Sequence, residues 1–375
     1  MNIHSLYFKN SFLGWEVEKI EFNQLNLLVG LSGAGKSQIL NALWFLRGIA
    51  LGSTMNNVEW EIAFSNEGID FEWSGKFGKS DDIYNNRFPI IREKIRATNI
   101  DQFVERDSEG AITIKEGKGD PQHQPLSTVG SGLLMQIYSD EHPFIRTALQ
   151  GFKKMVLRDH TLPQADISLG FYRLRFRYEK EKHGSMNMES IRRSGWTTSE
   201  RLLIADKNNL HEIHAIKEKF YTIFPNVTNI DIIEIKNNRG EGHIEYQIKA
   251  GGSKKWIPHW NISSGMLRVL NYLVEITLAD DDTVFLIDEF ENSLGHNCLP
   301  AMAEDIVMHS FSQQFIITSH HPDIINEFDL NTWLVVSRIN GKIHSEKALN
   351  LPFARSLHQP YLALINYFEN TQPAP

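Results

Sequence analysis

The sequence lacks the features that mark secreted, membrane-spanning and fibrous proteins. It has one cysteine, Cys298, which excludes an internal disulfide framework and is typical of a reducing compartment. No apolar run approaches the roughly 18 residues of a membrane span, and residues 1–10 lack the basic and apolar regions of a signal peptide. Neither a repeat of about 20–50 residues nor a long heptad run is present. We therefore expect a cytoplasmic protein without a coiled-coil arm.

The sequence also lacks an excess of positive charge. Asp and Glu number 46 against 38 Lys and Arg, for a net charge of −8, so any nucleic-acid binding needs a local basic patch. Hydrophobic residues at 41% and charged residues at 22% are ordinary for a globular chain. The length of 375 residues allows two or three domains.

One glycine-rich stretch stands out, residues 30–37, which read GLSGAGKS and fit the phosphate-loop pattern G-x-x-x-x-G-K-S. The apolar run 25–29 before it predicts a buried strand, and residues 38–46 after it have helical spacing. Such a loop wraps a phosphate with backbone N–H groups at a helix N-terminus. The pattern predicts an ATP site formed by Gly30, Leu31, Ser32, Gly33, Ala34, Gly35, Lys36, Ser37 and Gln38. Lys36 is expected at the β- and γ-phosphates and Ser37 at Mg²⁺.

Two apolar strands in the last third end in residues suited to the same site. The strand predicted at 283–287 leads into Asp288, a candidate for the Mg²⁺ shell, and Glu289, a candidate catalytic base for the attacking water. The strand predicted at 314–318 leads to His320, whose ring nitrogens suit a sensor of the γ-phosphate. The alternatives are a solvated acidic turn for the two acids and a surface turn before Pro322 for the histidine.

Residues 262–266 read ISSGM and open a helix predicted at 264–278. Ser263 is suited to cap that helix, whose first-turn N–H groups then face outward. The interval between Gly265 and Asp288 has room for one helix and one strand. The alternative is that Ser263 is a helix cap without a further role.

Taken in order, NLLVGLSGAGKS, ISSGMLR, VFLIDEFEN and IITSHHP resemble the motifs of ABC-type ATPase heads of the SMC/RecF/OLD-like class, often described as AAA family ATPases. The resemblance implies a head that dimerises around two ATP molecules. Ser263 and Gly265 of one head then contact the γ-phosphate on the other, and residues 291–296 form a loop across the interface. Two positions depart from the family pattern, because Ser264 stands where an acid is common and Gly295 where a histidine is more usual.

The fold class implied is α/β, a P-loop NTPase of ABC-ATPase type with a mixed central sheet, an antiparallel β flank and an inserted helical lobe. The β flank includes a hairpin of strands at 58–64 and 69–73 with a turn at 66–68. We expect an N-terminal ATPase lobe over 1–125, a helical lobe over 126–225, a C-terminal ATPase lobe over 226–350 and a tail over 351–375. Predicted helices within the lobe span 126–139, 143–156 and 201–224. A second hairpin is predicted from strands at 230–235 and 243–248.

Three further groups of residues carry weaker signals. Arg173, Arg175 and Arg177 alternate with apolar residues, so a strand at 171–178 would form a basic face for nucleic-acid phosphates or simply a solvated face. His296, Cys298 and His309 fit no familiar zinc spacing, and Cys298 suits a small buried side chain. The glutamine that links Mg²⁺ to the helical lobe in the family has only Gln102 and Gln124 as candidates.

The sequence thus favours an ATPase that dimerises and regulates a separate effector. It resembles the ATPase subunit of Septu-type or retron-associated anti-phage systems, which work with a nuclease or toxin. We expect no nuclease domain of the OLD-like kind after His320, because only 55 residues of this sequence follow it. A RecF-like DNA-repair ATPase and a nucleotide-binding scaffold with little turnover are the alternatives.

Overall fold

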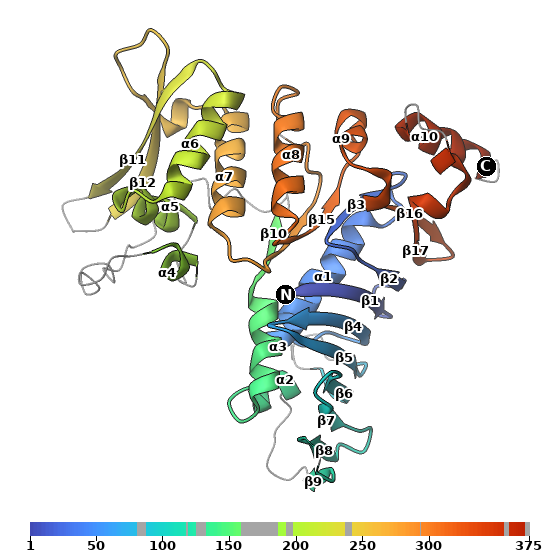
Figure 1. Ribbon diagram of the computed structural model, residues 1–375. Helices are drawn as coiled ribbons and strands as arrows, with labels where there is room; N and C mark the ends of the chain where they lie inside the picture. Colours follow the sequence, from blue (N-terminus) through green and yellow to red (C-terminus); the bar gives the residue numbers. More distant parts are fainter. Residues whose placement is uncertain are drawn as a thin grey trace. The chain divides into compact units, whose positions relative to one another are not determined.

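The computed structural model describes residues 1–80, 88–117, 119–124, 133–158, 187–192, 198–236, 242–292, 294–355 and 360–371. The chain forms two compact units (Figure 1). Unit 1 comprises Met1–Arg158, Asp282–Glu289 and Ser310–Pro375, and unit 2 comprises Asp159–Asp281 and Phe290–His309. The chain thus leaves unit 1 and returns to it twice. The domain ranges expected from the sequence stay a prediction.

Unit 1 is built on one mixed sheet with the strand order β10-β14-β15-β3-β16-β17-β2-β1-β4-β5-β6-β7-β8-β9. Its parallel part consists of β10 (Met155–Arg158), β14 (Val284–Ile287), β15 (Gln314–Thr318), β3 (Leu25–Val29) and β16 (Trp333–Ile339). Every residue of β3, β14 and β15 is buried, as parallel strands covered on both faces require. The carboxyl ends of these strands meet at one edge of the sheet.

The antiparallel β flank continues the same sheet. Its strands are β17 (Lys342–Lys347), β2 (Trp15–Glu21), β1 (Asn2–Asn10), β4 (Val58–Asn66), β5 (Ile69–Phe77), β6 (Ile90–Ala97), β7 (Gln102–Arg106), β8 (Ile112–Lys115) and β9 (Gln122–Gln124). β17 joins β2 in parallel, and from β2 onward neighbouring strands are antiparallel. The predicted hairpin at 58–73 is confirmed, with Glu67 and Gly68 at positive φ in its turn.

Helices α1 (Lys36–Ala50), α2 (Leu134–Tyr138) and α3 (Pro143–Lys153) pack with this sheet. The buried aromatic core joins Trp73 and Phe64 of the flank to Phe152 of α3, with ring centroids 5.2 and 5.0 Å apart. The prediction of one helix over 143–156 is wrong at its end, because Met155 starts β10 and pairs with Val284. The helix predicted at 126–139 begins at Leu134, and residues 126–132 lie outside the described part.

After β15, unit 1 continues through α9 (Pro322–Glu327), the short 3-10 helices η3 (Leu330–Thr332), η4 (Ala348–Asn350) and η5 (Pro352–Arg355), and α10 (Pro360–Thr371). The sequence did not predict α10. Its Tyr367 ring lies 5.6 Å from that of Phe353 in η5, so the helix packs on a neighbour that only the folded chain supplies. Among the described residues, no helix combines the length and apolar character needed to cross a bilayer.

Unit 2 contains α4 (Met188–Arg192), α5 (Thr198–Lys207), α6 (His211–Ile223), α7 (Ser264–Leu278), α8 (Leu299–His309) and the short 3-10 helix η2 (His259–Asn261). It also has a sheet of β11 (Val227–Lys236), β12 (Gly242–Ala250) and β13 (Ile257–Pro258), whose first two strands confirm the second predicted hairpin. The single helix predicted at 201–224 is wrong. Asn209 takes a left-handed conformation with φ 50°, and Leu210 N–H bonds to Ala205 O, which ends α5 before α6 begins.

A buried carboxyl group lies in the β flank of unit 1. Glu93 of β6 is 1% exposed, accepts a hydrogen bond from Trp73 Nε1 at 3.0 Å and accepts another from Leu134 N at 2.8 Å. Burial raises its pKa from 4.5 to about 7, although both hydrogen bonds and the charge of Arg106 act in the opposite direction. Glu93 therefore ties strand β6 to the first turn of α2 through a group that titrates near neutral pH.

This pKa predicts a pH dependence of stability. The pKa of Glu93 is higher in the folded state than in the unfolded state. Its contribution to the free energy of unfolding is therefore fully present below pH 4.5 and is lost as the pH rises through 7. The loss is about 3 kcal/mol in free energy of unfolding. Urea unfolding at pH 5 and pH 8 should show this fall, and Glu93→Gln should remove it. Glu105→Gln in β7, a half-exposed carboxyl paired with Lys94, is the matched control. If the free energy of unfolding fell equally between pH 5 and pH 8 in wild type and Glu93→Gln, the pH dependence would not come from Glu93.

Candidate nucleotide-binding site

The phosphate loop links β3 to α1 in unit 1. Gly33 and Gly35 have φ of 80° and 106°, and Gly35 is the N-cap of α1, so the turn uses conformations that favour glycine. Gly30 lies against β16, where a Cβ atom would stand 2.3 Å from Val336 O. Lys36 is only 5% exposed, and its Nζ donates to Gly30 O at 2.8 Å and Leu31 O at 3.0 Å. The ammonium group is thus held by the loop that it follows.

Two residues from the ends of β14 and β15 meet the start of α1. Ser37 Oγ donates to Asp288 Oδ1 at 3.1 Å, and Thr318 Oγ1 donates to the same oxygen at 2.5 Å. These side chains converge because Ile287 pairs with Ile317 and Ile317 with Leu27, which places the three strand ends at one edge. Asp288 is 8% exposed. The structure therefore brings together the loop serine and the aspartate that the sequence singled out.

These oxygens fit a magnesium ion. Mg²⁺ prefers hard oxygen ligands and is usually held by one or two protein groups plus phosphates and water. A serine hydroxyl and a buried carboxylate in contact at the mouth of a phosphate loop supply that donor set. Ser37 and Asp288 would hold the ion, which when bound neutralises phosphate charge.

Glu289 follows Asp288 and is half-buried. Its backbone has φ 46°, uncommon for a residue other than glycine, and its N–H donates to Thr318 Oγ1 at 2.8 Å. The Thr318 hydroxyl thus contacts both acidic residues. Sequence reasoning missed Thr318, and the available signal was a polar residue closing the apolar strand 314–318.

The histidines after β15 have different surroundings. His320 is exposed and lies two residues beyond Thr318, at the same edge of the sheet. His321 Nδ1 accepts from Asp323 N at 3.3 Å and caps α9, a structural role. The role of His320 as a γ-phosphate sensor stays a prediction.

Ser263 is confirmed as the N-cap of α7. Its Oγ accepts from Met266 N at 3.2 Å, and both Ser263 and Ser264 are exposed, while Gly265 is half-buried. These residues belong to unit 2. Their contact with a nucleotide on a second head stays a prediction.

The remaining candidates lie elsewhere. Gln102 and Gln124 fall in β7 and β9 of the β flank, and the magnesium-linking glutamine stays unassigned. Cys298 is 1% exposed, in line with a small buried side chain, and burial raises the pKa of its thiol. Arg173, Arg175 and Arg177 lie outside the described residues.

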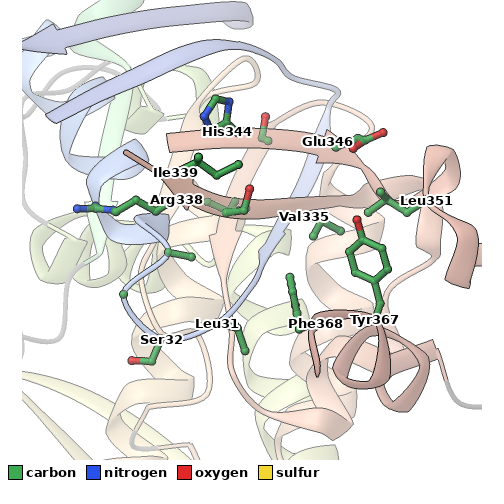
Figure 2. Close-up of a pocket in the computed structure, with 15 residues that line it drawn as sticks. Leu31, Ser32, Val335, Arg338, Ile339, His344, Glu346, Leu351, Tyr367 and Phe368 are labelled. Carbon is green, nitrogen blue, oxygen red and sulfur yellow. The ribbon is translucent and has the colours of Figure 1, made fainter. Parts of the chain in front are cut away.

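A pocket of about 830 Å³ opens beside the tip of the phosphate loop (Figure 2). Leu31 and Ser32 of the loop form one side, Ile339 of β16 another, and Tyr367 and Phe368 of α10 a third. We call it the loop-side pocket. Sequence reasoning missed it because α10 was not predicted.

The sheet order, the loop and the acidic strand end define a P-loop NTPase fold of the ABC-ATPase type, as the sequence predicted. A solved structure described as the SmcHead bound to the C-winged helix domain of ScpA has this fold, with a TM-score of 0.50, 17% identity, and coverage of 95% of this chain and 100% of that one. The SMC head domain from Thermotoga maritima aligns with a TM-score of 0.40 at 14% identity, over 92% of this chain and 99% of that one.

A family model described as "AAA domain, putative AbiEii toxin, Type IV TA system" matches residues 198–326. Among curated proteins, none matches this chain. The family match is limited to residues 198–326, and the likeness to the SmcHead structure is one of fold.

Proposed function

We propose that this chain is an ATP-hydrolysing head whose ATP-dependent dimerisation regulates a separate effector, a nuclease or toxin, in anti-phage defence. The observation that carries the ATPase part is the hydrogen-bonded chain Ser37–Asp288–Thr318–Glu289 at the mouth of the phosphate loop. It joins the residues that would hold the phosphates and the metal to the residue suited to activate water.

The chemistry assigned to these residues is in-line phosphoryl transfer. Glu289 accepts a proton from a water molecule as its oxygen attacks the γ-phosphorus. The bond from that phosphorus to the bridging oxygen breaks, and ADP leaves with phosphate. Lys36 leaves its loop carbonyls to neutralise the β- and γ-phosphate oxygens, while Thr318 keeps the backbone of Glu289 in place.

The dimer part is supported by the exposed N-terminus of α7. The start of α7 exposes two hydroxyl groups, those of Ser263 and Ser264, together with first-turn N–H groups on the surface of unit 2. This arrangement is suited to bind a phosphate held by another molecule. The solved SmcHead structure contains the C-winged helix domain of ScpA, and this supports a head that works with a second protein.

The defence part is supported by the description of the matching family, which names a putative AbiEii toxin and a type IV toxin–antitoxin system. A nuclease or reverse-transcriptase gene beside this one would support the defence role. Replication genes there would favour the DNA-repair alternative. Nucleic-acid binding through Arg173, Arg175 and Arg177 stays a prediction.

The first experiment is the mass of Glu289→Gln in light scattering, with and without ATP and Mg²⁺. Glutamine retains the size of the side chain but does not take a proton, so ATP stays bound and the dimer accumulates. We expect the mass to double only with ATP and the increase to disappear in Glu289→Gln with Ser263→Arg. The same mass in both states would contradict ATP-dependent dimerisation and favour a nucleotide-binding scaffold.

A further inference from the structure

In the described part of unit 2, Trp260 lies on the surface beside the start of α7. Trp260 of η2 is 65% exposed, whereas Trp60, Trp73 and Trp333 are fully buried. An exposed indole keeps a large apolar area in water, and such side chains are enriched where proteins bind partners. Trp260 stands three residues before Ser263, the N-cap of α7.

The side chain of Trp260 lies against a buried histidine ring. Its indole meets the His259 ring edge to face, with centroids 4.9 Å apart and planes at 87°. His259 is 7% exposed, and its Nδ1 lies 3.7 Å from Glu245 Oε2 of β12, which is buried as well. A side chain backed by a packed ring loses little rotamer freedom on binding, so Trp260 is suited to act as an anchor.

The loop-side pocket of unit 1 is complementary to such an anchor. Its volume of about 830 Å³ exceeds the need of an indole. Ile339, which is 57% exposed, and the rings of Tyr367 and Phe368 offer apolar contact, and the Glu346 carboxylate at the rim can accept the indole N–H (Figure 2). One edge of the pocket is the phosphate loop itself, at Leu31.

We propose that Trp260 of one copy inserts into the loop-side pocket of a second copy in the ATP-bound dimer. The inference rests on the proposed function, in which Ser263 of one head contacts the γ-phosphate at the loop of the other. Three residues span at most about 10 Å, so this contact carries Trp260 to the loop of the second copy, where the pocket opens. In a two-fold dimer the contact occurs twice.

Through this contact, dimerisation depends on the conformation of the phosphate loop in the copy that provides the pocket. Because the pocket shares Leu31, Ser32 and Gly33 with the phosphate loop, a nucleotide that orders the loop also shapes the pocket for Trp260. Buried aromatic anchors carry a large share of the binding energy of an interface. ATP then favours dimerisation through the pocket as well as through the phosphates.

The test measures the ATP-dependent dimer in the Glu289→Gln background. Trp260→Ala should raise the dimer dissociation constant at least about tenfold, as expected for an anchor residue, and leave the ATP affinity of the monomer unchanged. Met308→Ala in α8 is the matched control, because Met308 is 60% exposed and lies outside the proposed contact. Trp260 is mostly exposed, so its removal should not unfold unit 2.

A second variant tests the contact by filling the loop-side pocket. Ser345→Trp places an indole in the pocket of its own chain and should weaken the dimer to a similar degree. For direct proof, Trp260→Cys and Ser345→Cys are combined with Cys298→Ala, and a short bismaleimide is added. Covalently linked dimers are expected with ATP and not without it.

The outcomes separate the two proposals. If Glu289→Gln dimerises with ATP and Trp260→Ala does so equally well, the Trp260 contact is wrong and the proposed function stands. If no cross-linked dimers form under conditions that produce the ATP-bound dimer, the Trp260 contact is likewise wrong and the proposed function stands. If Glu289→Gln stays monomeric with ATP, the proposed dimerisation fails and the Trp260 contact fails with it.

Discussion

Glu289→Gln is expected to lower the rate of ATP hydrolysis about 10³-fold, because a positioned general base contributes roughly 10²–10⁴-fold. The backbone of Glu289 is set by the Thr318 hydroxyl rather than by its own carboxylate, so the substitution should leave the loop and its affinity for ATP intact. Phosphate release under single-turnover conditions measures the chemical step, and nucleotide titration measures binding.

The matched control is Glu327→Gln, which neutralises an exposed carboxylate at the end of α9 in the same unit. It should leave turnover within about twofold, as expected for a surface substitution away from the site. A Glu289→Gln protein that hydrolyses ATP at the wild-type rate would show that another group activates water. A protein that no longer binds ATP would show that Glu289 supports the loop.

Gly30→Ala is expected to lower the free energy of unfolding of unit 1 by about 3 kcal/mol or more. Its Cβ would stand 2.3 Å from the backbone oxygen of Val336, and neither β3 nor β16 can shift without disturbing a buried parallel pair. Urea unfolding followed by circular dichroism measures the loss. ATP binding should fall as well, because a displaced residue 30 shifts the backbone of the phosphate loop that it opens.

Gly14→Ala separates the clash from the general effect of losing a glycine. Gly14 has φ 73° and open space around it, so alanine there meets only the cost of a left-handed backbone, about 1–2 kcal/mol. Equal losses at Gly30 and Gly14 would mean that β3 and β16 adjust to the added methyl group. In that case close approach would not explain the glycine that opens the loop.

Much of the parallel part of the sheet, and helix α7 of unit 2, could be predicted from the sequence because their signals are local. Residues 314–318 form the predicted strand and residues 264–278 the predicted helix, with the Ser263 cap confirmed. Apolar runs of strand length and a serine before a periodic stretch report on buried strands and helix starts without knowledge of neighbours.

The secondary-structure predictions were wrong or missing where contacts with distant segments of the chain decide the conformation. Met155 has helical spacing with α3 but forms β10, because a free edge of β14 accepts it. The polar residues 75–125 gave little pattern beyond short strands such as one at 111–114, yet the described residues between 90 and 124 form four strands that extend the β flank. The helix α10, and with it the loop-side pocket, depends on packing against η5 and α9, which the sequence pattern of 360–371 does not reveal.

The sequence by itself determined the phosphate loop, the acidic strand end and the cap at Ser263, because each is a short run whose chemistry depends on adjacent residues. Only the tertiary structure decided that Ser37 and Thr318 donate to the same oxygen of Asp288. It also decided that the Thr318 hydroxyl accepts from the backbone N–H of Glu289. Strand order brings these residues together across long stretches of chain, and strand order follows from pairing and burial over the whole sheet.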